Sequence, residues 1–161
     1  MAGSIIHTDG LTKYFGKNRA VVGLELDVHE GEVFGYLGAN GAGKTTTIRM
    51  LLDIIRPTQG KATVFGLDSH KQSLEIRRDI GYLPGELSLY DDMSGAEFLR
   101  YSSNLRGGST SYSGFEIAER LSCDLARPIR DLSHGNKQKL GLIQAFMHRP
   151  RLIILDEPSQ G

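Results

Sequence analysis

Residues 38–45, with the sequence Gly-Ala-Asn-Gly-Ala-Gly-Lys-Thr, constrain the fold more than any other segment of the chain. The spacing Gly-x-x-x-x-Gly-Lys-Thr is typical of a loop whose backbone N–H groups surround the phosphates of a nucleotide. Because glycine has no Cβ, Gly38, Gly41 and Gly43 are expected to adopt positive φ angles that turn these N–H groups inward. The alternative is an ordinary glycine-rich turn between a strand and a helix, with an exposed lysine.

The segments on either side of this loop favour a nucleotide site. Residues 32–37 have the pattern of a short apolar strand, and residues 46–55 have that of a helix whose N-terminus would face the phosphates. Lys44 would lie between the β- and γ-phosphates, and the Thr45 hydroxyl would ligate a magnesium ion that bridges them. The expected nucleotide contacts are therefore Gly38, Ala39, Asn40, Gly41, Ala42, Gly43, Lys44, Thr45 and Thr46.

The composition predicts a compact protein without a membrane-spanning helix or a nucleic-acid footprint. The 161 residues include 19 basic and 19 acidic ones, so the formal net charge is zero. No apolar run approaches the ~20 residues of a spanning helix, and the N-terminus lacks the pattern of a signal peptide. The single cysteine, Cys123, cannot form an internal disulfide and is expected to be a partly buried, unreactive thiol. These features predict a cytoplasmic protein.

Strand and helix patterns alternate along the chain, and the middle third is mostly helical. Strands are expected near residues 5–12, 20–28, 32–37, 62–65, 80–83 and 152–155, and helices near residues 44–55, 69–78, 95–105, 114–125 and 134–148. Residues 107–113 have the composition of a linker.

A second motif lies near the end of the chain, where four apolar residues, 152–155, are followed by two carboxylates. The pattern predicts a fully buried parallel strand, and ligands of open α/β sheets bind at the carboxyl ends of such strands. Asp156 would hold the magnesium ion, and Glu157 would act as the catalytic base that polarises an attacking water. Alone, the motif could be an ordinary turn after a strand. Together with the phosphate loop, it indicates nucleotide hydrolysis.

A third motif, residues 131–139, opens a helix. Ser133 is a suitable N-cap, and this structural explanation would suffice for the motif on its own. However, the order of phosphate loop, Leu-Ser-x-Gly helix start and apolar strand with Asp-Glu-Pro resembles the nucleotide-binding domain of ATP-binding cassette (ABC) proteins. The resemblance covers essentially the whole chain. It implies that the ligands are ATP and Mg²⁺, and that Ser133 and Gly135 contact ATP bound to the opposite subunit of a homodimer or heterodimer.

The resemblance also implies an ATP-binding role for Tyr14, at the position where the family has an aromatic ring that stacks on adenine. The alternative for Tyr14 is a strand residue in the core. Two elements depart from the family pattern. The glutamine that usually follows Pro84 is replaced by Gly85 and then Glu86, of which only Glu86 could contact metal or water. Residues 132–136 read Leu-Ser-His-Gly-Asn where the family has Leu-Ser-Gly-Gly-Gln. These variants resemble drug and antibiotic exporters of the family.

The fold implied by the resemblance is an α/β phosphate-loop ATPase core with an N-terminal antiparallel β subdomain and a helical subdomain at about residues 86–148. Residues 1–161 would form a single, partial ATP-binding domain that is incomplete at the C-terminus, because domains of this family continue for several dozen residues. The family inserts a further strand between the strand ending at Asp156 and the strand entering the phosphate loop. Without it we expect unpaired backbone groups and a poorly stable chain.

The function implied by the resemblance is that of the ATPase subunit of a membrane exporter. Such a subunit is cytoplasmic and is held at the inner face of the membrane by a separate polytopic membrane subunit, with no nucleic-acid partner. Two alternatives stay open. One is a nucleotide-binding fragment without turnover. The other is a soluble ABC protein that acts on ribosomes or DNA, although the tandem cassettes and long basic insertions usual in such proteins are not visible.

Overall fold

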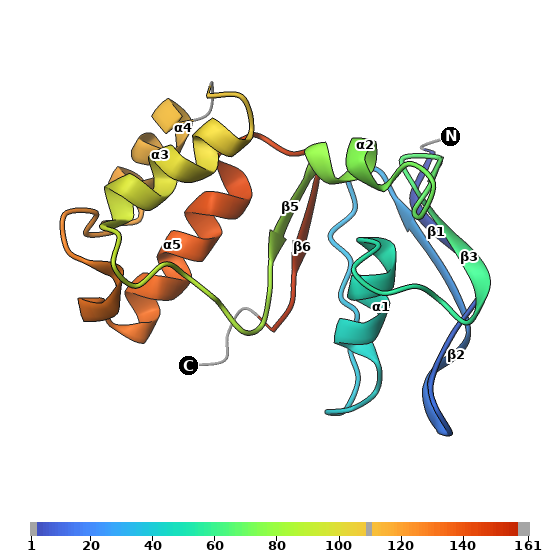
Figure 1. The fold of residues 1–161 in the computed structure, drawn as a ribbon. Coiled ribbons are helices and arrows are strands. Elements are labelled where there is room, and N and C mark those ends of the chain that lie inside the picture. The colour runs from blue at the N-terminus through green and yellow to red at the C-terminus, as the bar shows by residue number, and fades with distance from the viewer. Residues whose placement is uncertain (1–2, 109–110, 158–161) are drawn as a thin grey trace. The chain divides into compact units, whose positions relative to one another are not determined.

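The structure, a computed structural model, describes residues 3–108 and 111–157 (Figure 1). The chain divides into two compact units, Met1–Arg77 and Arg78–Gly161, and each contains its own sheet. Within the described ranges, no helix combines the length and the apolar character needed to cross a bilayer. The presence of sheets and helices together confirms the predicted α/β class.

The first unit contains an antiparallel sheet with the strand order β2-β1-β3-β4. In β1 and β2, Phe15 lies opposite Asn18 across a tight turn that begins at Gly16, whose φ is 59°. Ile6 and Leu11 of β1 and Val64 of β3 are buried in the core. The predicted N-terminal antiparallel β subdomain is therefore confirmed. The bounds are β1 (Ser4–Phe15), β2 (Asn18–His29), β3 (Gln59–Val64) and β4 (Leu67–Asp68).

Two buried threonines stabilise the irregular register between β1 and β2. The Thr8 hydroxyl donates to the carbonyl of Leu24 at 2.8 Å and accepts from the N–H of Leu26 at 2.8 Å. The Thr12 hydroxyl accepts from the N–H of Gly23 at 2.9 Å. Because the register shifts between Thr8 and Leu11, these hydroxyls replace ladder hydrogen bonds that the backbone cannot make there.

Helix α1 (Lys44–Leu51) follows the phosphate loop and is shorter than the predicted helix at 44–55. It ends because Asp53 adopts a left-handed conformation with a φ of 53°, and the next N–H, that of Ile54, donates to the carbonyl of Arg49 at 2.8 Å. This pattern of hydrogen bonds closes a helix C-terminus. The helix at residues 44–55 was predicted from apolar periodicity, and this periodicity does not reveal that Asp53 adopts a left-handed conformation.

The strand predicted at residues 32–37 is absent from the structure, so this prediction is wrong. These residues form no ladder with any described strand. Val33 and Leu37 are almost fully exposed, and Phe34 is 43% exposed. An apolar sequence favours a strand only where a neighbouring strand supplies hydrogen bonds and a packing surface.

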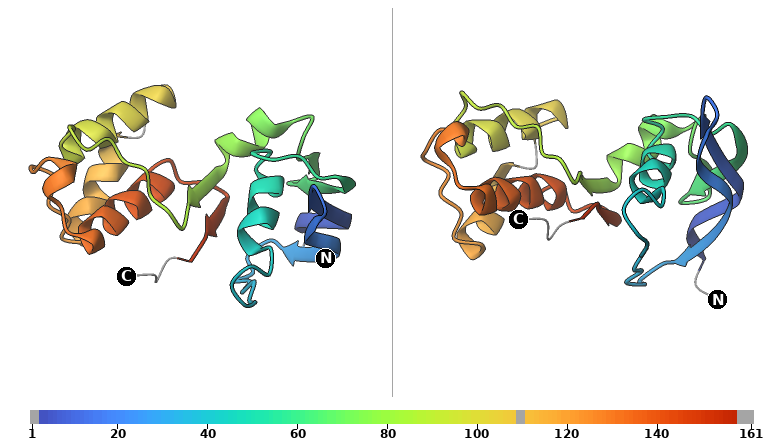
Figure 2. Two further views of the ribbon diagram at one scale, coloured as in Figure 1. Left: turned by 60° about the horizontal axis from the view of Figure 1, so that its bottom comes forward. Right: turned by 90° about the horizontal axis from the view of Figure 1, so that it is seen from below.

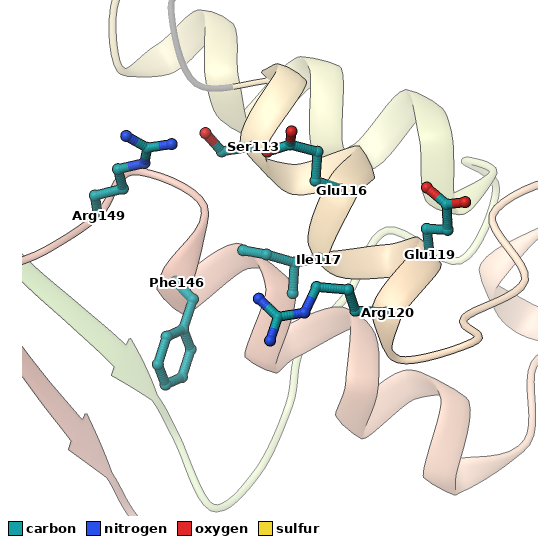
Figure 3. Close-up of a pocket in the computed structure, with 7 residues that line it drawn as sticks. All are labelled: Ser113, Glu116, Ile117, Glu119, Arg120, Phe146 and Arg149. Carbon is teal, nitrogen blue, oxygen red and sulfur yellow. The ribbon is translucent and has the colours of Figure 1, made fainter.

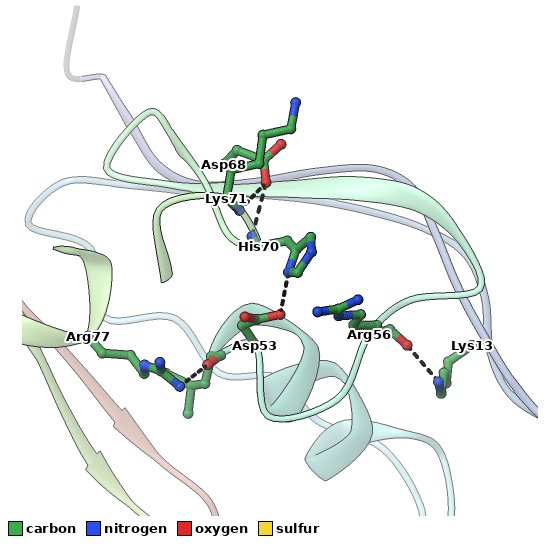
Figure 4. A network of polar contacts seen from close by, with 8 residues as sticks. Lys13, Asp53, Arg56, Asp68, His70, Lys71 and Arg77 are labelled. Carbon is green, nitrogen blue, oxygen red and sulfur yellow. Dashed lines mark hydrogen bonds and ion pairs between the residues drawn. The ribbon is translucent and has the colours of Figure 1, made fainter. Parts of the chain in front are cut away.

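Helix α2 (Ser73–Arg78) begins later than the predicted residue 69. The Asp68 side chain accepts hydrogen bonds from the N–H groups of His70 and Lys71, both at 3.0 Å, and holds these residues in a turn (Figure 4). These bonds, first that of Lys71 and then that of His70, lower the pKa of Asp68. Such local bonds compete with helix formation. In the same network, His70 pairs with Asp53 at 2.9 Å.

The second unit contains two parallel strands, β5 (Ile80–Leu83) and β6 (Leu152–Leu155). The predicted parallel strand is therefore confirmed. The prediction that it is fully buried is wrong, because residues of β6 are half-buried and Leu155 is 39% exposed. Only β5 pairs with β6 in the described part of the chain. Side chains of an edge strand keep part of their surface in water.

The helices of the second unit lie beside one another (Figure 2), and their side chains form an apolar cluster. Their bounds are α3 (Gly95–Leu105), α4 (Ser111–Arg120), the 3₁₀ turn η1 (Ile129–Asp131) and α5 (His134–Phe146). Ser94 caps α3 by accepting a hydrogen bond from the N–H of Glu97. The Glu97 carboxylate accepts in return from the N–H and then the hydroxyl of Ser94, and these bonds lower the pKa of Glu97. The cluster consists of Phe98, Leu99, Ala118, Ile129, Leu132, Leu140, Ile143 and Met147.

The boundaries of α4 differ from the prediction at both ends. The helix already begins at Ser111, so the linker predicted at 107–113 is wrong for residues 111–113, while residues 109–110 lie outside the described ranges. It ends at Arg120 because Ser122 adopts a left-handed conformation with a φ of 49°. The Cys123 thiol is half-buried, as predicted, and its burial raises its pKa.

His148 connects the end of α5 to β5. Its Nε2 lies 3.1 Å from the carbonyl oxygen of Ile80, so Nε2 carries the proton and donates. Its Nδ1 is buried and has no hydrogen-bond partner among the described residues. Burial, and then the nearby charge of Arg106, lower the pKa of His148.

We predict that the free energy of unfolding falls as the pH is lowered through 6.5, the ordinary pKa of histidine. In the unfolded chain His148 binds a proton at this pH. In the folded chain its pKa is lower, so it binds the proton only at a lower pH, and acid therefore favours the unfolded state. Urea unfolding at pH 7.5 and 5.5 measures the effect. His148→Gln retains a donor for Ile80 but does not titrate, and should reduce the pH dependence. His7→Gln, at an exposed position, is the control. An unchanged pH dependence in His148→Gln would contradict the assignment.

Candidate functional site

The phosphate loop obtains its shape from two left-handed glycines. Gly41 has a φ of 81° and Gly43 a φ of 87°. Between them, the N–H of Ala42 donates to the carbonyl of Ala39 at 3.0 Å and closes a turn. Gly38 does not have a positive φ, so that part of the prediction is wrong. A Cβ on Gly38 would lie 3.0 Å from the Cβ of Ala42, so close approach explains this glycine.

Gly43 is the N-cap of α1 and packs directly against β2. A Cβ on Gly43 would collide with the carbonyl oxygen of Ala20 and lie 2.8 Å from Cγ2 of Val21. No side chain caps the helix, and its first turn contains no acidic residue. The positive end of the helix dipole is therefore not offset by a neighbouring carboxylate, which favours an anion at this end.

Lys44 folds its ammonium group back over the loop. Nζ donates to the carbonyl oxygen of Gly38 at 2.7 Å and to that of Ala39 at 3.0 Å. Thr45 and Thr46 are half-buried in the first turn of α1. The loop thus combines a positive charge, a helix N-terminus and hydroxyl groups, a set of groups that suits a phosphate chain.

Tyr36 makes a contact with Thr47 that the sequence analysis missed. Its hydroxyl lies 3.4 Å from the hydroxyl of Thr47, which is only 1% exposed. This bond ties the segment before the phosphate loop to the first turns of α1. The position of this tyrosine, two residues before the glycine-rich loop, was the sequence signal that could have indicated the contact.

Two neighbouring aromatic residues lie at the end of β1. Tyr14 is half-buried, and its N–H donates to the hydroxyl of Thr58 at 3.1 Å. The ring of Phe15 is 50% exposed, with Nζ of Lys13 at 5.2 Å from its centroid. Successive side chains of a strand point to opposite faces, so only one of the two rings can serve a given ligand. Phe15 is a candidate that the sequence analysis did not consider.

The carboxylates of the second motif follow β6. Asp156 is 3% exposed, and its N–H donates to the carbonyl of Leu83 at 2.9 Å. A Cβ on Gly85 would lie 3.4 Å from the carbonyl oxygen of Asp156 and 3.9 Å from Cβ of Glu157, so the segment after β5 passes close by. Glu157 is half-buried with a φ of 50°, a conformation that is uncommon for a residue other than glycine. Glu86 is exposed.

Ser133 caps α5, as predicted, by accepting a hydrogen bond from the N–H of Asn136 at 3.3 Å. Both Ser133 and Gly135 are exposed. A Cβ on Gly135 would meet no atom within 4 Å. Packing within the described chain therefore does not explain why residue 135 is a glycine, whereas close approach of an external group would.

A magnesium ion would suit the oxygen donors that the sequence places at this site. The Thr45 hydroxyl and the buried Asp156 carboxylate are hard oxygen ligands, the type that magnesium prefers. The two residues belong to different units, so a site that they share stays a prediction. Among the described residues, no group of three histidine, cysteine, aspartate or glutamate side chains could hold a metal ion.

The matched family model identifies the class of protein. The model described as ABC transporter matches residues 21–160, which include the phosphate loop, the start of α5 and the carboxylates after β6. The chain therefore belongs to the ABC transporter family.

Individual relatives are ATP-binding proteins of transporters. The chain is 39% identical to the bacitracin transport ATP-binding protein BcrA of Bacillus licheniformis over 160 residues, which cover 98% of this chain and 52% of the relative. It is 36% identical to the probable multidrug ABC transporter ATP-binding protein YbhF of Escherichia coli, over 98% of this chain and 28% of the relative. The chain thus spans about half the length, or less, of these curated relatives.

Solved structures agree on the fold. The ATP-binding subunit of an ABC transporter superposes with a TM-score of 0.84 at 27% identity, covering 97% of this chain and 67% of that one. The dimeric, post-hydrolysis ATP-binding cassette MJ0796, bound to ADP and Pi, also superposes with a TM-score of 0.84 at 20% identity, covering 96% of this chain and 74% of that one.

We predict that Gly43→Ala destabilises the chain more than Gly41→Ala. Both positions have a positive φ, which costs an alanine about 1–2 kcal/mol. Only at Gly43 would the new Cβ also collide with β2, because at Gly41 it would meet no atom within 4 Å. We expect Gly43→Ala to cost at least about 1 kcal/mol more than Gly41→Ala in the free energy of unfolding, measured in urea. Equal losses would contradict the role assigned to the contact with Ala20.

Proposed function

We propose that the chain is the ATP-binding part of a membrane exporter's ATPase subunit, which couples ATP-driven closure of a dimer to transport. The observation that carries this proposal is the phosphate loop. Left-handed Gly41 and Gly43 lead into an uncapped helix N-terminus, and the ammonium of Lys44 lies over the loop. The membership of this chain in the ABC transporter family and the transport functions named for BcrA and YbhF support the exporter assignment.

In this proposal, backbone N–H groups of residues 38–46 bind the phosphates of ATP, and Lys44 moves its ammonium from the carbonyl oxygens of the loop to the β- and γ-phosphates. Thr45 and Asp156 hold Mg²⁺, which would neutralise charge on the phosphates. Glu157 accepts a proton from the attacking water and so promotes in-line displacement at the γ-phosphate. The low exposure of Asp156 keeps its carboxylate in a poorly solvated place, where charge interactions are stronger.

Dimerisation completes the proposed site. Ser133 and Gly135 would contact ATP held by a second ATP-binding domain, either a copy of this chain or a related one. Their exposure at the N-terminus of α5 supports this, because a helix N-terminus attracts phosphate and Gly135 leaves room for close approach. The dimeric form of the structural neighbour is consistent with the arrangement.

The proposal includes a separate polytopic membrane subunit that would hold the protein at the cytoplasmic face of the membrane. The neutral charge of the chain gives no reason to expect a nucleic-acid partner. As a domain assignment, we propose that residues 1–161 form one partial ATP-binding domain with a helical subdomain at about residues 86–148.

We predict that Lys44→Ala weakens ATP binding at least about tenfold, because a charge-assisted bond to phosphate contributes ~1.5–3 kcal/mol. Lys61→Ala, which removes an exposed lysine paired with Asp9, is the matched control. Binding is measured by titration with a fluorescent ATP analogue.

Glu157→Gln should retain binding but lose turnover in the full-length protein with its membrane subunit. Turnover that survives Glu157→Gln would contradict the assigned base. If neither the unsubstituted protein nor Glu157→Gln shows turnover, the result would favour a nucleotide-binding protein that does not hydrolyse ATP. Copurification with ribosomes would instead favour a soluble ABC protein.

We predict that Tyr14→Ala weakens ATP binding about fivefold, because stacking on adenine contributes about 1 kcal/mol. Binding of inorganic triphosphate, which has no base, should not change. Phe15→Ala is the matched variant, since the two rings lie on opposite faces of β1. A loss for Phe15→Ala with none for Tyr14→Ala would assign the stacking ring to Phe15 instead.

A further inference from the structure

A groove of about 470 Å³ lies between α4 and the end of α5, within the second unit (Figure 3). Ile117 of α4 and Phe146 of α5 provide its apolar surface, and the ring of Phe146 is 40% exposed. Arg120 and Arg149 provide positive charge at its walls. The groove shares no residue with the nucleotide site proposed above.

The two arginines of the groove lack the partners that five other arginines of this unit have. Arg127, Arg130 and Arg151 form ion pairs, Arg100 lies 5.4 Å from the ring centroid of Phe115, and Arg106 donates to the carbonyl of Arg78. By contrast, no ion pair or hydrogen bond joins the guanidinium of Arg120 or Arg149 to any described residue. Two unpaired guanidinium groups therefore line one groove.

Arg120 does not use the carboxylate that is nearest to it along the helix. Glu116 precedes it by one helical turn, a spacing at which glutamate and arginine commonly pair. In Figure 3, Arg120 instead extends with Ile117 toward Phe146, while Glu116 and Glu119 point away from that ring. The positive charge thus lies beside the apolar surface, whereas the two carboxylates, which also line the groove, point away from the ring of Phe146.

Arg149 has a backbone conformation that normally favours glycine. Its φ is 52°, and it directly precedes Pro150 after the end of α5. An arginine in the left-handed region is destabilising relative to glycine, so packing of this turn does not explain the side chain. An interaction of the guanidinium with something outside the described chain would.

We propose that this groove docks a peptide segment of a partner protein in which a large apolar side chain is flanked by carboxylates. The apolar side chain would pack between Ile117 and Phe146, and the carboxylates would pair with Arg120 and Arg149. Arginine and aromatic residues are the types that most often anchor protein interfaces. Because Phe146 and both arginines are exposed, the occupant would keep one side in water, which suits a surface-bound peptide better than an enclosed metabolite.

The test is selection of a displayed library of random dodecapeptides on the full-length protein. We expect enrichment of peptides in which aspartate or glutamate neighbours leucine or phenylalanine. Fluorescence anisotropy then measures binding of the enriched peptides to variants. Phe146→Ser, Arg120→Glu and Arg149→Glu should each weaken binding by roughly thirtyfold, the loss typical of an anchor residue. Arg130→Glu makes the same charge change outside the groove and should have no effect.

Arg149→Gly separates a docking role from a structural one. Glycine relieves the left-handed conformation, so the melting temperature should rise while peptide binding falls. All groove variants should bind ATP normally, which keeps this test independent of the proposed ATPase function. No enrichment, enrichment of basic peptides, binding that the groove variants do not weaken, or equally tight binding of a small aromatic acid such as benzoate would each overturn the proposal.

Discussion

The close approach between Gly43 and the carbonyl group of Ala20 determines where the phosphate loop ends and where α1 begins. A backbone that passes this near to β2 leaves no room for a side chain, so the helix starts without a capping residue. The same contact therefore sets both the position of the helix N-terminus and its lack of an internal partner. An anion can then take the place that an N-cap side chain occupies in most helices.

The second unit depends on a comparable contact. A Cβ on Gly81 would collide with the carbonyl oxygen of Ala145, and one on Gly141 would lie 2.8 Å from a side-chain carbon of Leu83. Glycines on both β5 and α5 thus allow the helix to lie directly on the strand. This packing fixes the position of β5. The ladder between β5 and β6 then fixes Leu155, and Asp156, the next residue, lies in a buried position.

Elements with a strong local signal were predictable from the sequence, and elements that depend on distant partners were not. The phosphate loop, β5, β6 and the Ser133 cap follow from short motifs whose residue types have one physical use. Residues 32–37 carry the composition of a strand, yet without a hydrogen-bonding neighbour in the described chain they form none. Helix ends were misjudged where a left-handed residue, such as Asp53 or Ser122, stops a helix that apolar periodicity would continue. The half-exposed ring of Phe15 could not be distinguished from Tyr14, because exposure is decided by the twist and pairing of β1.

Helix α5 has mechanical properties that follow from where it is held. Its 13 residues correspond to a rod of about 20 Å. The contacts of Gly141 with Leu83 and of Ala145 with Gly81, together with the hydrogen bond of His148 to Ile80, join its C-terminal half to β5. A tilt of about 10° around this pivot would displace the N-terminal end by roughly 3 Å, about the length of one hydrogen bond. Any such tilt would therefore be largest at the end of the helix that carries Ser133.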